Sequence, residues 1–599
     1  MRAFLVLAWF TAAAIGVGLG ELLLQDLAGT GGTCRKAILF AQASLRGPDN
    51  ITTDIASFDA GKNAERNLQR WVNRQMWREL LPQPYSFKLN LQVGTDIAER
   101  SHAVLLPHEV FHTLYHHAPE VFTKIMRGGS MESLLNFWKE ASEIGDEWYR
   151  QHPVIQKVAD PRLMIPFGFH GDDAGVQGQE QVLVITWGGV AAKLATLDTR
   201  IVYTMLKVAS IVPYDTLQTV YQVLTWSLNA LSCGKFPEND HLGNPITSDS
   251  DPKRFAMGGQ DLAEGCVGVF SEMRGDWKFL KESLYLQQHY GLNNLICHRC
   301  AVLKFTNDIG MRFTNFKRDA PHRLMCYTHA AWMAMMLAAA IVSPLLYICG
   351  FHISRVIFDI LHCMELGIYQ VAVPSAMKEM TQKNDIWPGA TRKARFIGAF
   401  KAYSVWRKQR RVKAYTSKPF SAKVWTKHKY PKISQLTMKG AALRSMVYWM
   451  SETCKVNSVD DHSKLRAFMF ESFVKADKIC RSAGRHMTKR DHKLFCLHLE
   501  HALVSYNALA VEASANKKTL WKLLPKFHAV THYYDTRVNP RRVSCYQDED
   551  MVGKVKKIYC ACHGSTAPFR GLQRYAILQC LRWRALLLQV RFGVGAAPQ

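Results

Sequence analysis

Two aspartates follow two short apolar segments, a pattern that suits metal-ion chemistry. The predicted elements are three strands at 162–169, 181–187 and 200–212, a helix at 214–231, and a fourth strand at 265–270. Asp172 comes after the first strand and Asp276 after the fourth. A rigid sheet edge can present carboxylates to a metal ion, although Gly-Asp also occurs in ordinary turns. Two such acids and a third from a later helix could hold two Mg²⁺ ions about 4 Å apart.

The segment 539–557 offers that third carboxylate. Acidic residues open it and lysines close it, as the helix dipole favours. Glu549 is the predicted metal ligand. The alternative is that the acids only complement the positive end of a helix, with no chemistry attached.

A second metal pattern is Cys297-x-x-Cys300. This spacing suits one Zn²⁺ held by two thiolates, with histidine completing a tetrahedron; unliganded thiols are the alternative. Several residues further on could supply the rest of the site: His322, Cys326 and His329. His362 is either a fourth ligand or a core histidine bonded to Asp359.

The composition predicts a folded, basic protein. The chain has 599 residues, 48% of them hydrophobic, and its formal net charge is +27. Wholesale disorder is therefore excluded, and the length predicts more than one structural unit. A strongly basic chain favours a polyanionic partner, either nucleic acid or an anionic membrane face. Fifteen cysteines without regular spacing favour a reducing compartment.

The positive charge is densest between residues 391 and 432. This segment has fourteen Lys or Arg and no Asp or Glu, so it could neutralise phosphates, while its aromatic residues either stack on bases or pack inward. A solvated basic face is the alternative. The predicted DNA contacts are Arg407, Lys408, Arg410, Arg411 and Lys413.

Two apolar runs bear on where in the cell the protein would be found. Residues 1–20 resemble a secretory signal, a short anchor or a spurious extension, which leaves secretory routing open. The run 330–349 is long enough for a membrane segment, but Ser343-Pro344 interrupts it, so a buried helix running into a strand is expected. A membrane partner is not expected.

These motifs together resemble the cut-and-paste DDE transposases of the CACTA-like group and their relatives. The resemblance covers about residues 160–570 and rests on the order of six motifs. These are Gly168-Phe169-His170-Gly171-Asp172, Arg274-Gly275-Asp276-Trp277, Cys297-x-x-Cys300, Ser343-Pro344-Leu345-Leu346, Asp359-x-x-His362-x-x-Glu365-Leu366-Gly367 and Asp548-Glu549-Asp550-x-x-Gly553-x-x-Lys556.

The resemblance implies an α/β fold, with a ribonuclease H-like mixed sheet interrupted by a large helical insertion. It implies that Asp172, Asp276 and Glu549 bind Mg²⁺ or Mn²⁺ for DNA cleavage and strand transfer, and that Cys297, Cys300 and His329 bind zinc. Here Asp550 occupies the place after Glu549 where relatives commonly have a basic residue. The acids left as alternatives are Asp548, Asp550 and Glu365 for the third ligand, and Asp173 for the first.

The implied partner is DNA, in the family's terms transposon ends, and a homo-oligomer is also expected. A functional enzyme would act in the nucleus. A catalytically inactive DNA-binding relic of a transposase is the alternative function. The expected domains are a signal-like or spurious segment 1–20, a helical region 21–155, the first part of the core 156–285, a Cys/His zinc-type segment 286–370, a basic helical insertion 371–535 and a C-terminal core helix with its tail 536–599.

Overall fold

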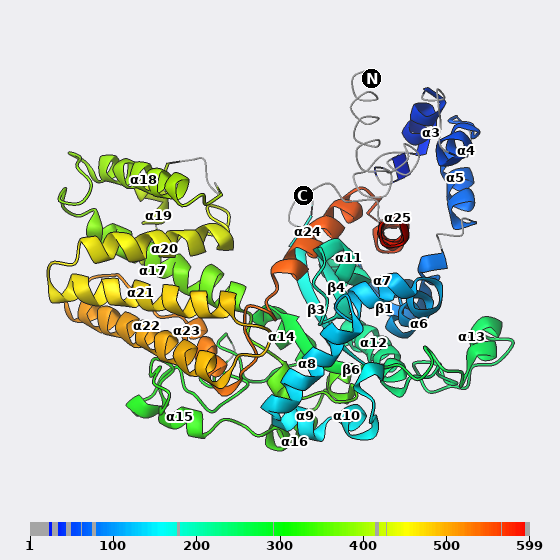
Figure 1. Cartoon of the computed structure of the whole chain (residues 1–599), viewed down its shortest axis with the longest axis horizontal. Helices are drawn as coiled ribbons and strands as arrows, with labels where there is room; N and C mark the ends of the chain where they lie inside the picture. The colour runs from blue at the N-terminus through cyan, green and yellow to red at the C-terminus, as the bar shows by residue number, and fades with distance from the viewer. Residues whose placement is uncertain are drawn as a thin grey trace. The chain divides into compact units, whose positions relative to one another are not determined.

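A computed structural model describes residues 23–592, apart from residues 25, 27–33, 44–49, 62, 75–78, 177–179, 292, 414–418, 427 and 565. The chain divides into two compact units (Figure 1). Unit 1 comprises Met1–Met273, Ala340–Arg355 and Tyr546–Gln599, and unit 2 comprises Arg274–Ala339 and Val356–Cys545. The predicted signal-like segment 1–20 lies outside the described residues.

Unit 1 is built on a mixed four-stranded sheet in the order β5-β4-β3-β6. Its strands are β3 (Met164–Gly175), β4 (Gln181–Gly189), β5 (Ile201–Lys207) and β6 (Val267–Gly275). β3 pairs antiparallel with β4, and β4 pairs antiparallel with β5. The four predicted strands therefore form one sheet, and the predicted helix lies between the third and the fourth in sequence. The chain is an α/β protein with additional helical regions.

The sheet is covered on both faces. Every residue of β6 is buried, and since successive side chains point to opposite faces of a strand, neither face of β6 meets solvent. Helix α12 (Thr216–Cys233) packs on β5, where the Tyr203 hydroxyl donates to the Val220 carbonyl at 3.0 Å. Gly234, at φ 77°, ends this helix in the left-handed conformation that glycine tolerates best. Helix α24 (Tyr546–Cys560) packs on β3 and β4.

Unit 1 is less purely helical before the sheet than the sequence predicted. Strands β1 (Tyr85–Val93) and β2 (Asp96–Val104) form a two-stranded antiparallel hairpin. Buried and exposed residues do not alternate clearly along β2, since most of its residues before His102 are exposed. The sequence therefore lacked a strand signal there and predicted a helical region. The other helices are α3 (Cys34–Ala43), α4 (Asn50–Ala56), α5 (Ala64–Asn73), α6 (Pro107–His117), α7 (Pro119–Ile125), α8 (Met131–Ile144), α9 (Glu147–Gln151), α10 (Pro153–Lys157), α11 (Thr196–Thr199), α13 (Pro252–Met257) and α25 (Ala567–Phe592).

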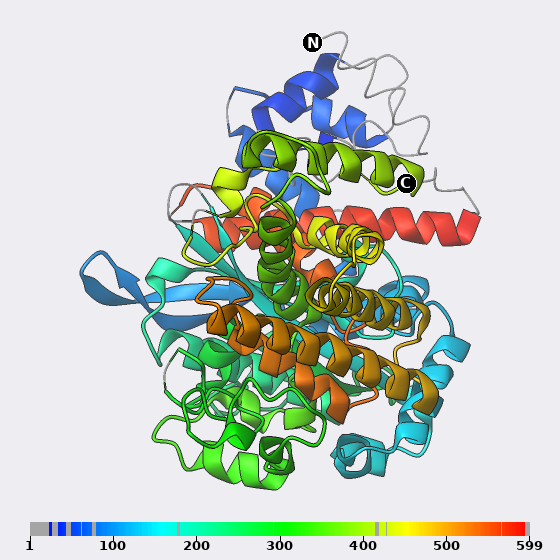
Figure 2. The same ribbon diagram turned by 90° about the vertical axis from the view of Figure 1, so that its left-hand side faces the viewer.

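Unit 2 is helical, as expected for the insertion. Its helices are α14 (Trp277–Leu284), α15 (Pro321–Leu324), α16 (His329–Leu337), α17 (Tyr369–Met380), α18 (Arg392–Gln409), α19 (Ala422–Trp425), α20 (Gly440–Val456), α21 (Asp461–Ser482), α22 (Lys489–Ala515) and α23 (Pro525–Ala529). Helices α21 and α22 run side by side, in yellow and orange in both views (Figures 1 and 2). One apolar core extends from Trp277 to Val543 and joins these helices.

The basic segment resolves the alternatives left open for its aromatic residues. Phe396, Tyr403, Phe420 and Trp425 are all buried, with at most 5% of any of them exposed. These rings pack against one another, and the Phe420 and Trp425 centroids lie 4.7 Å apart. They therefore form the inner side of α18 and α19 and do not stack on bases.

The apolar run 330–349 does not form the buried helix and strand that the sequence predicted. It forms the short helix α16, of which only Trp332 and Met336 are buried, and a 3-10 turn at Pro344–Tyr347. Ser343 caps the start of that turn, and Pro344 is its first residue. Among the described helices, α22 is long and apolar enough to cross a membrane, and half of its most apolar stretch is buried inside the protein.

His462 links three helices of unit 2 through two carboxylates. Its Nε2 lies 3.1 Å from Glu379 of α17, and its Nδ1 lies 2.8 Å from Glu512 of α22. The hydrogen bond to Glu379 raises the pKa of His462 to about 9. Because this pKa is above that of an unfolded histidine, about 6.5, protonation of His462 stabilises the folded state.

We expect the stability of unit 2 to decline on the alkaline side. The contribution of His462 is complete below about pH 6.5 and is lost as the pH rises through about 9, by about 1 kcal/mol after solvent screening. His462→Gln should remove this part of the pH dependence of urea unfolding between pH 6.5 and 9. His498→Gln is the matched control, because burial lowers the pKa of His498 and keeps it neutral over that range. Equal pH dependence in the wild type and His462→Gln would contradict this assignment.

Candidate metal centre

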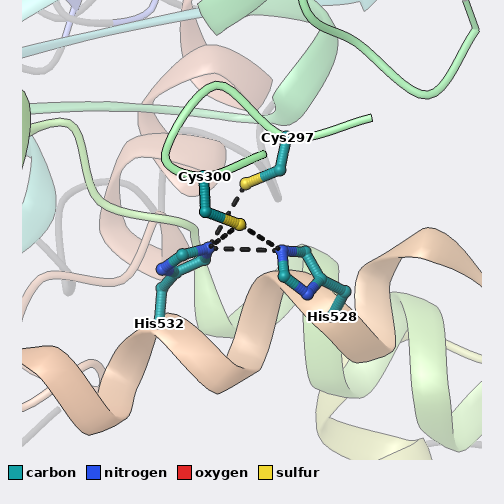
Figure 3. Close-up of side chains that lie close together, drawn as sticks. All are labelled: Cys297, Cys300, His528 and His532. Atoms are coloured by element: carbon teal, nitrogen blue, oxygen red, sulfur yellow. Dashed lines mark hydrogen bonds between the residues drawn. The ribbon is translucent and has the colours of Figure 1, made fainter. Parts of the chain in front are cut away.

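Four side chains of unit 2 converge on one point (Figure 3). They are Cys297, Cys300, His528 and His532, all buried, and their ligand atoms lie within 4.8 Å of one another. Cys297 Sγ lies 3.3 Å from His532 Nε2, Cys300 Sγ lies 3.3 Å from His528 Nε2, and the two Nε2 atoms are 3.3 Å apart. Two thiols and two imidazoles can hold a metal ion such as zinc.

The separations fit a tetrahedron around one ion. With Zn–N near 2.05 Å and Zn–S near 2.3 Å, tetrahedral angles put two nitrogens about 3.3 Å apart and a nitrogen and a sulfur about 3.6 Å apart. The observed nitrogen–nitrogen distance is 3.3 Å, and the nitrogen–sulfur distances are 3.3 and 3.7 Å. These separations are close to those of a zinc site, so the cluster could hold a metal ion such as zinc.

Local backbone structure places each pair of ligands. The two cysteines lie on a loop after α14, and the amide of Arg299 donates to Cys297 Sγ at 3.3 Å, which turns the loop around the sulfur. His528 belongs to α23, and His532 to the 3-10 turn Val530–Asp535 that follows it. Residues four apart on a helical segment share a face, so both imidazoles point to the same side.

A carboxylate behind His532 orients its ring. His532 Nδ1 lies 2.9 Å from Asp535 Oδ2, which leaves Nε2 facing the sulfurs; a carboxylate in this position also increases the basicity of a metal-bound imidazole. Burial would raise the pKa of Asp535, but the hydrogen bond with His532 and the charge of Arg323 lower it to about 2. Burial lowers the pKa of His528 well below its ordinary value, so His528 stays neutral, the form that binds metal.

The structure brings together only part of the predicted zinc set. Cys297 and Cys300 are in the cluster, but it does not bring His329 or His362 to them. His329 begins α16 and is partly exposed. Sequence reasoning missed His528 and His532 because 228 residues separate Cys300 from His528. The signal available was the His-x3-His spacing, which suits two ligands on one helical turn.

His362 instead adopts the second of its two predicted roles. Its Nδ1 lies 2.7 Å from Asp359 Oδ2, and Asp359 Oδ1 accepts a hydrogen bond from the amide of Cys545. Although burial raises the pKa of Asp359, the hydrogen bond with His362 lowers it below its usual value. Both residues line a cavity of about 40 Å³ that Asp276 and Lys526 also border.

Of the three predicted catalytic acids, Asp172 and Glu549 belong to unit 1 and Asp276 belongs to unit 2. Asp172 lies within β3, opposite Val184, and not after the strand as predicted, because pairing with β4 continues to Gly175. Glu549 lies in the first turn of α24, partly buried. Asp276 follows β6 directly and caps α14, where it accepts a hydrogen bond from the amide of Phe279 at 2.7 Å. Their role as metal ligands remains a prediction.

Two of the alternative acids have structural roles. Asp548 is fully buried and pairs with Arg200 Nε at 2.8 Å within unit 1. Glu365 is buried in unit 2, where it accepts a hydrogen bond from Arg444 Nη1 at 2.8 Å. Removing one partner of a buried carboxylate–arginine pair strongly destabilises the fold, because the other charge is left buried without compensation. The other two alternative acids are not buried in this way. Asp550, which follows Glu549, is exposed. Asp173, which follows Asp172, points to the opposite face of β3.

The chain matches no protein-family model, and comparison with curated proteins finds no match.

We expect the purified chain to bind a single zinc ion. His528→Ala should weaken zinc binding by more than the ~10–100-fold that loss of an outer hydrogen-bond partner costs, and Asp535→Asn should fall in that 10–100-fold range. His329→Ala is the control and should bind zinc as the wild type does. Metal analysis and competition with a chromogenic chelator measure these affinities. Equal losses in His329→Ala and His528→Ala would show that the ligand set is different.

Proposed function

We propose that the chain is a transposon-derived DDE transposase, which cleaves DNA and transfers strands with a ribonuclease H-like core. The observation that carries this proposal is the strand order β5-β4-β3-β6. Three consecutive strands form an antiparallel meander, and the fourth then returns beside the first. In a ribonuclease H-like sheet the first and fourth strands are likewise neighbours.

The strand order supports the choice of the first two acids. Asp172 lies on β3, and Asp276 follows β6, the neighbour of β3 in the sheet. Neighbouring strands of a rigid sheet are well suited to present carboxylates to the same metal ions. We therefore propose both acids as metal ligands.

The position of α24 supports the third acid. This helix packs on β3 and β4 and carries Glu549 in its first turn. Its neighbour Asp548 is committed to Arg200, and Asp550 is exposed. Glu549 is thus the residue of this acidic triplet that is placed best to serve as a ligand.

The proposed site would hold Mg²⁺ or Mn²⁺ through Asp172, Asp276 and Glu549. Metal ions bound there would stabilise the charge that develops on a phosphodiester during in-line attack, first by water and then by a DNA 3′-OH. The protein's part is to hold the three carboxylates in position. The zinc centre would brace the helical unit that the family's fold inserts into this core.

The basic segment supplies a surface that suits DNA. Four of its aromatic rings are buried: Phe396, Tyr403, Phe420 and Trp425. The cations of α18 and the following turn face solvent: Lys408, Arg410, Arg411 and Lys413 are exposed. Arg410 also pairs with Glu452 at 2.9 Å, and Arg407 donates to the Val412 carbonyl. Such a surface would bind the phosphate backbone without reading sequence.

A specific observation also favours a second candidate, a DNA-binding protein without catalysis. The Asp276 carboxylate caps α14, and this helix-capping role alone would account for an aspartate there. The two candidates share a DNA-binding surface and differ only in Mg²⁺-dependent chemistry.

Acid-to-amide substitutions separate these candidates. We expect Asp172→Asn and Glu549→Gln each to reduce Mg²⁺-dependent cleavage of the DNA that flanks the gene by at least ~100-fold, because each removes a charged metal ligand. The neighbours provide matched controls, and Asp173→Asn and Asp550→Asn should retain cleavage. Binding of the same DNA should be nearly unchanged in all four variants. A wild-type chain that binds but never cleaves would favour the non-catalytic candidate.

Neutralising the basic segment should weaken DNA binding uniformly across sequences. We expect the triple variant Lys408→Ala, Arg411→Ala, Lys413→Ala to bind more weakly, with the slope of log affinity against log salt lowered by about 0.9 for each phosphate that the variant no longer neutralises. The control removes the same charge from α21, through Lys464→Ala, Lys475→Ala and Lys478→Ala. Equal losses in both triple variants, measured by fluorescence anisotropy across salt concentrations, would show that only net charge matters.

A further inference from the structure

A third cysteine lies against the metal centre. The Cys326 thiol forms a second group of potential metal ligands with His532 and Asp535, and the ligand atoms of these three residues lie within 4.8 Å of one another. A tetrahedral zinc site has four ligands, and Cys297, Cys300, His528 and His532 can supply them without Cys326. Cys326 therefore needs another explanation.

The backbone holds Cys300 and Cys326 directly opposite each other. They form an antiparallel bridge, and the amide of Tyr327 donates to the Arg299 carbonyl at 3.0 Å beside it. That hydrogen bond joins the residues that flank the cysteines and not the cysteines themselves. Cys300 and Cys326 are therefore a non-hydrogen-bonded pair of an antiparallel ladder, in which the Cα atoms are about 4.5 Å apart. This separation is within the range that a disulfide requires, about 4.4–6.8 Å.

Access to solvent distinguishes the three cysteines. Cys297 and Cys300 are fully buried, whereas Cys326 is partly exposed. A small oxidant would therefore meet Cys326 first. Cys297 is less suited to be its partner, because the antiparallel bridge puts Cys300, and not Cys297, opposite Cys326.

We propose that Cys300 and Cys326 form a redox-sensitive pair, in which a peroxide joins them in a disulfide and so withdraws Cys300 from the metal centre. This inference rests on the metal centre and is independent of the proposed DNA chemistry. Losing one of two thiolates leaves a three-ligand site, which binds zinc less tightly than the complete tetrahedron.

The atoms and electrons balance with hydrogen peroxide as the oxidant. The Cys326 sulfur attacks one peroxide oxygen and the O–O bond breaks, which yields a sulfenic acid and one water. The Cys300 thiolate then attacks the Cys326 sulfur, an S–S bond forms, and the departing hydroxide takes a proton from solvent to leave as a second water. The two sulfurs together lose two electrons, and these reduce the peroxide to two waters.

The experiment treats the zinc-loaded full chain with hydrogen peroxide. Zinc release is followed with a chromogenic chelator, and disulfides are mapped by peptide mass spectrometry. In the wild type we expect a Cys300–Cys326 disulfide to form in step with zinc release. In Cys326→Ser the zinc should stay bound under the same treatment. Cys562→Ser, which replaces a partly exposed cysteine just beyond the end of α24, is the matched control and should release zinc as the wild type does.

Three outcomes would overturn the inference. One is a predominant Cys297–Cys300 disulfide in the wild type, and another is zinc release from Cys326→Ser at the wild-type rate. The third is loss of zinc from Cys326→Ser under reducing conditions, which would make Cys326 itself a ligand. Cys326→Ala provides a second test of the same role, with zinc content before oxidation reporting that its metal centre is formed.

Discussion

The tetrahedral arrangement of two thiols and two imidazoles is the constraint on which the architecture of unit 2 depends. Cys300 and His528 are 228 residues apart, and almost the whole helical insertion lies between them. Closing so long a loop costs conformational entropy, although the cost grows only slowly with loop length. A metal ion held at this closure would contribute its binding free energy directly to folding. The carboxylate of Asp535 and the guanidinium of Arg323 then keep His532 in the orientation that the site needs.

The acidic residues of the chain fall into two physical classes. Asp548 and Glu365 are buried and compensated by arginine, so their charges serve packing and hold the fold. Asp172 and Glu549 are only partly buried, on a strand and on the helix that packs over it. A carboxylate that is to bind a divalent ion must be fixed by a rigid element and still be reachable, which is the second arrangement. This difference supports Glu549 over its buried neighbour Asp548.

The basic segment shows how one stretch of sequence can serve folding and binding together. Its rings close the core between α18 and α19, and its cations are left on the outside. Long basic side chains keep their charges in water while their neighbours pack inward. The proposed DNA surface is thus a by-product of how this part of unit 2 buries its aromatic residues.

By itself the sequence determined the α/β class, the order of three strands, a helix and a strand, and the helical character of the insertion, because apolar runs and helical periodicity are local signals. It also identified Cys297 and Cys300, whose short spacing is local too. Tertiary structure alone decided that His528 and His532 complete the cluster, that Cys326 faces Cys300, and that four aromatic rings of the basic segment are buried. It also decided that Asp172 lies within β3 and that residues 85–104 form a hairpin. These outcomes depend on which distant segments meet and on which polar groups are buried together; a spacing such as His-x3-His shows which residues can share a face, and not which distant segment they contact.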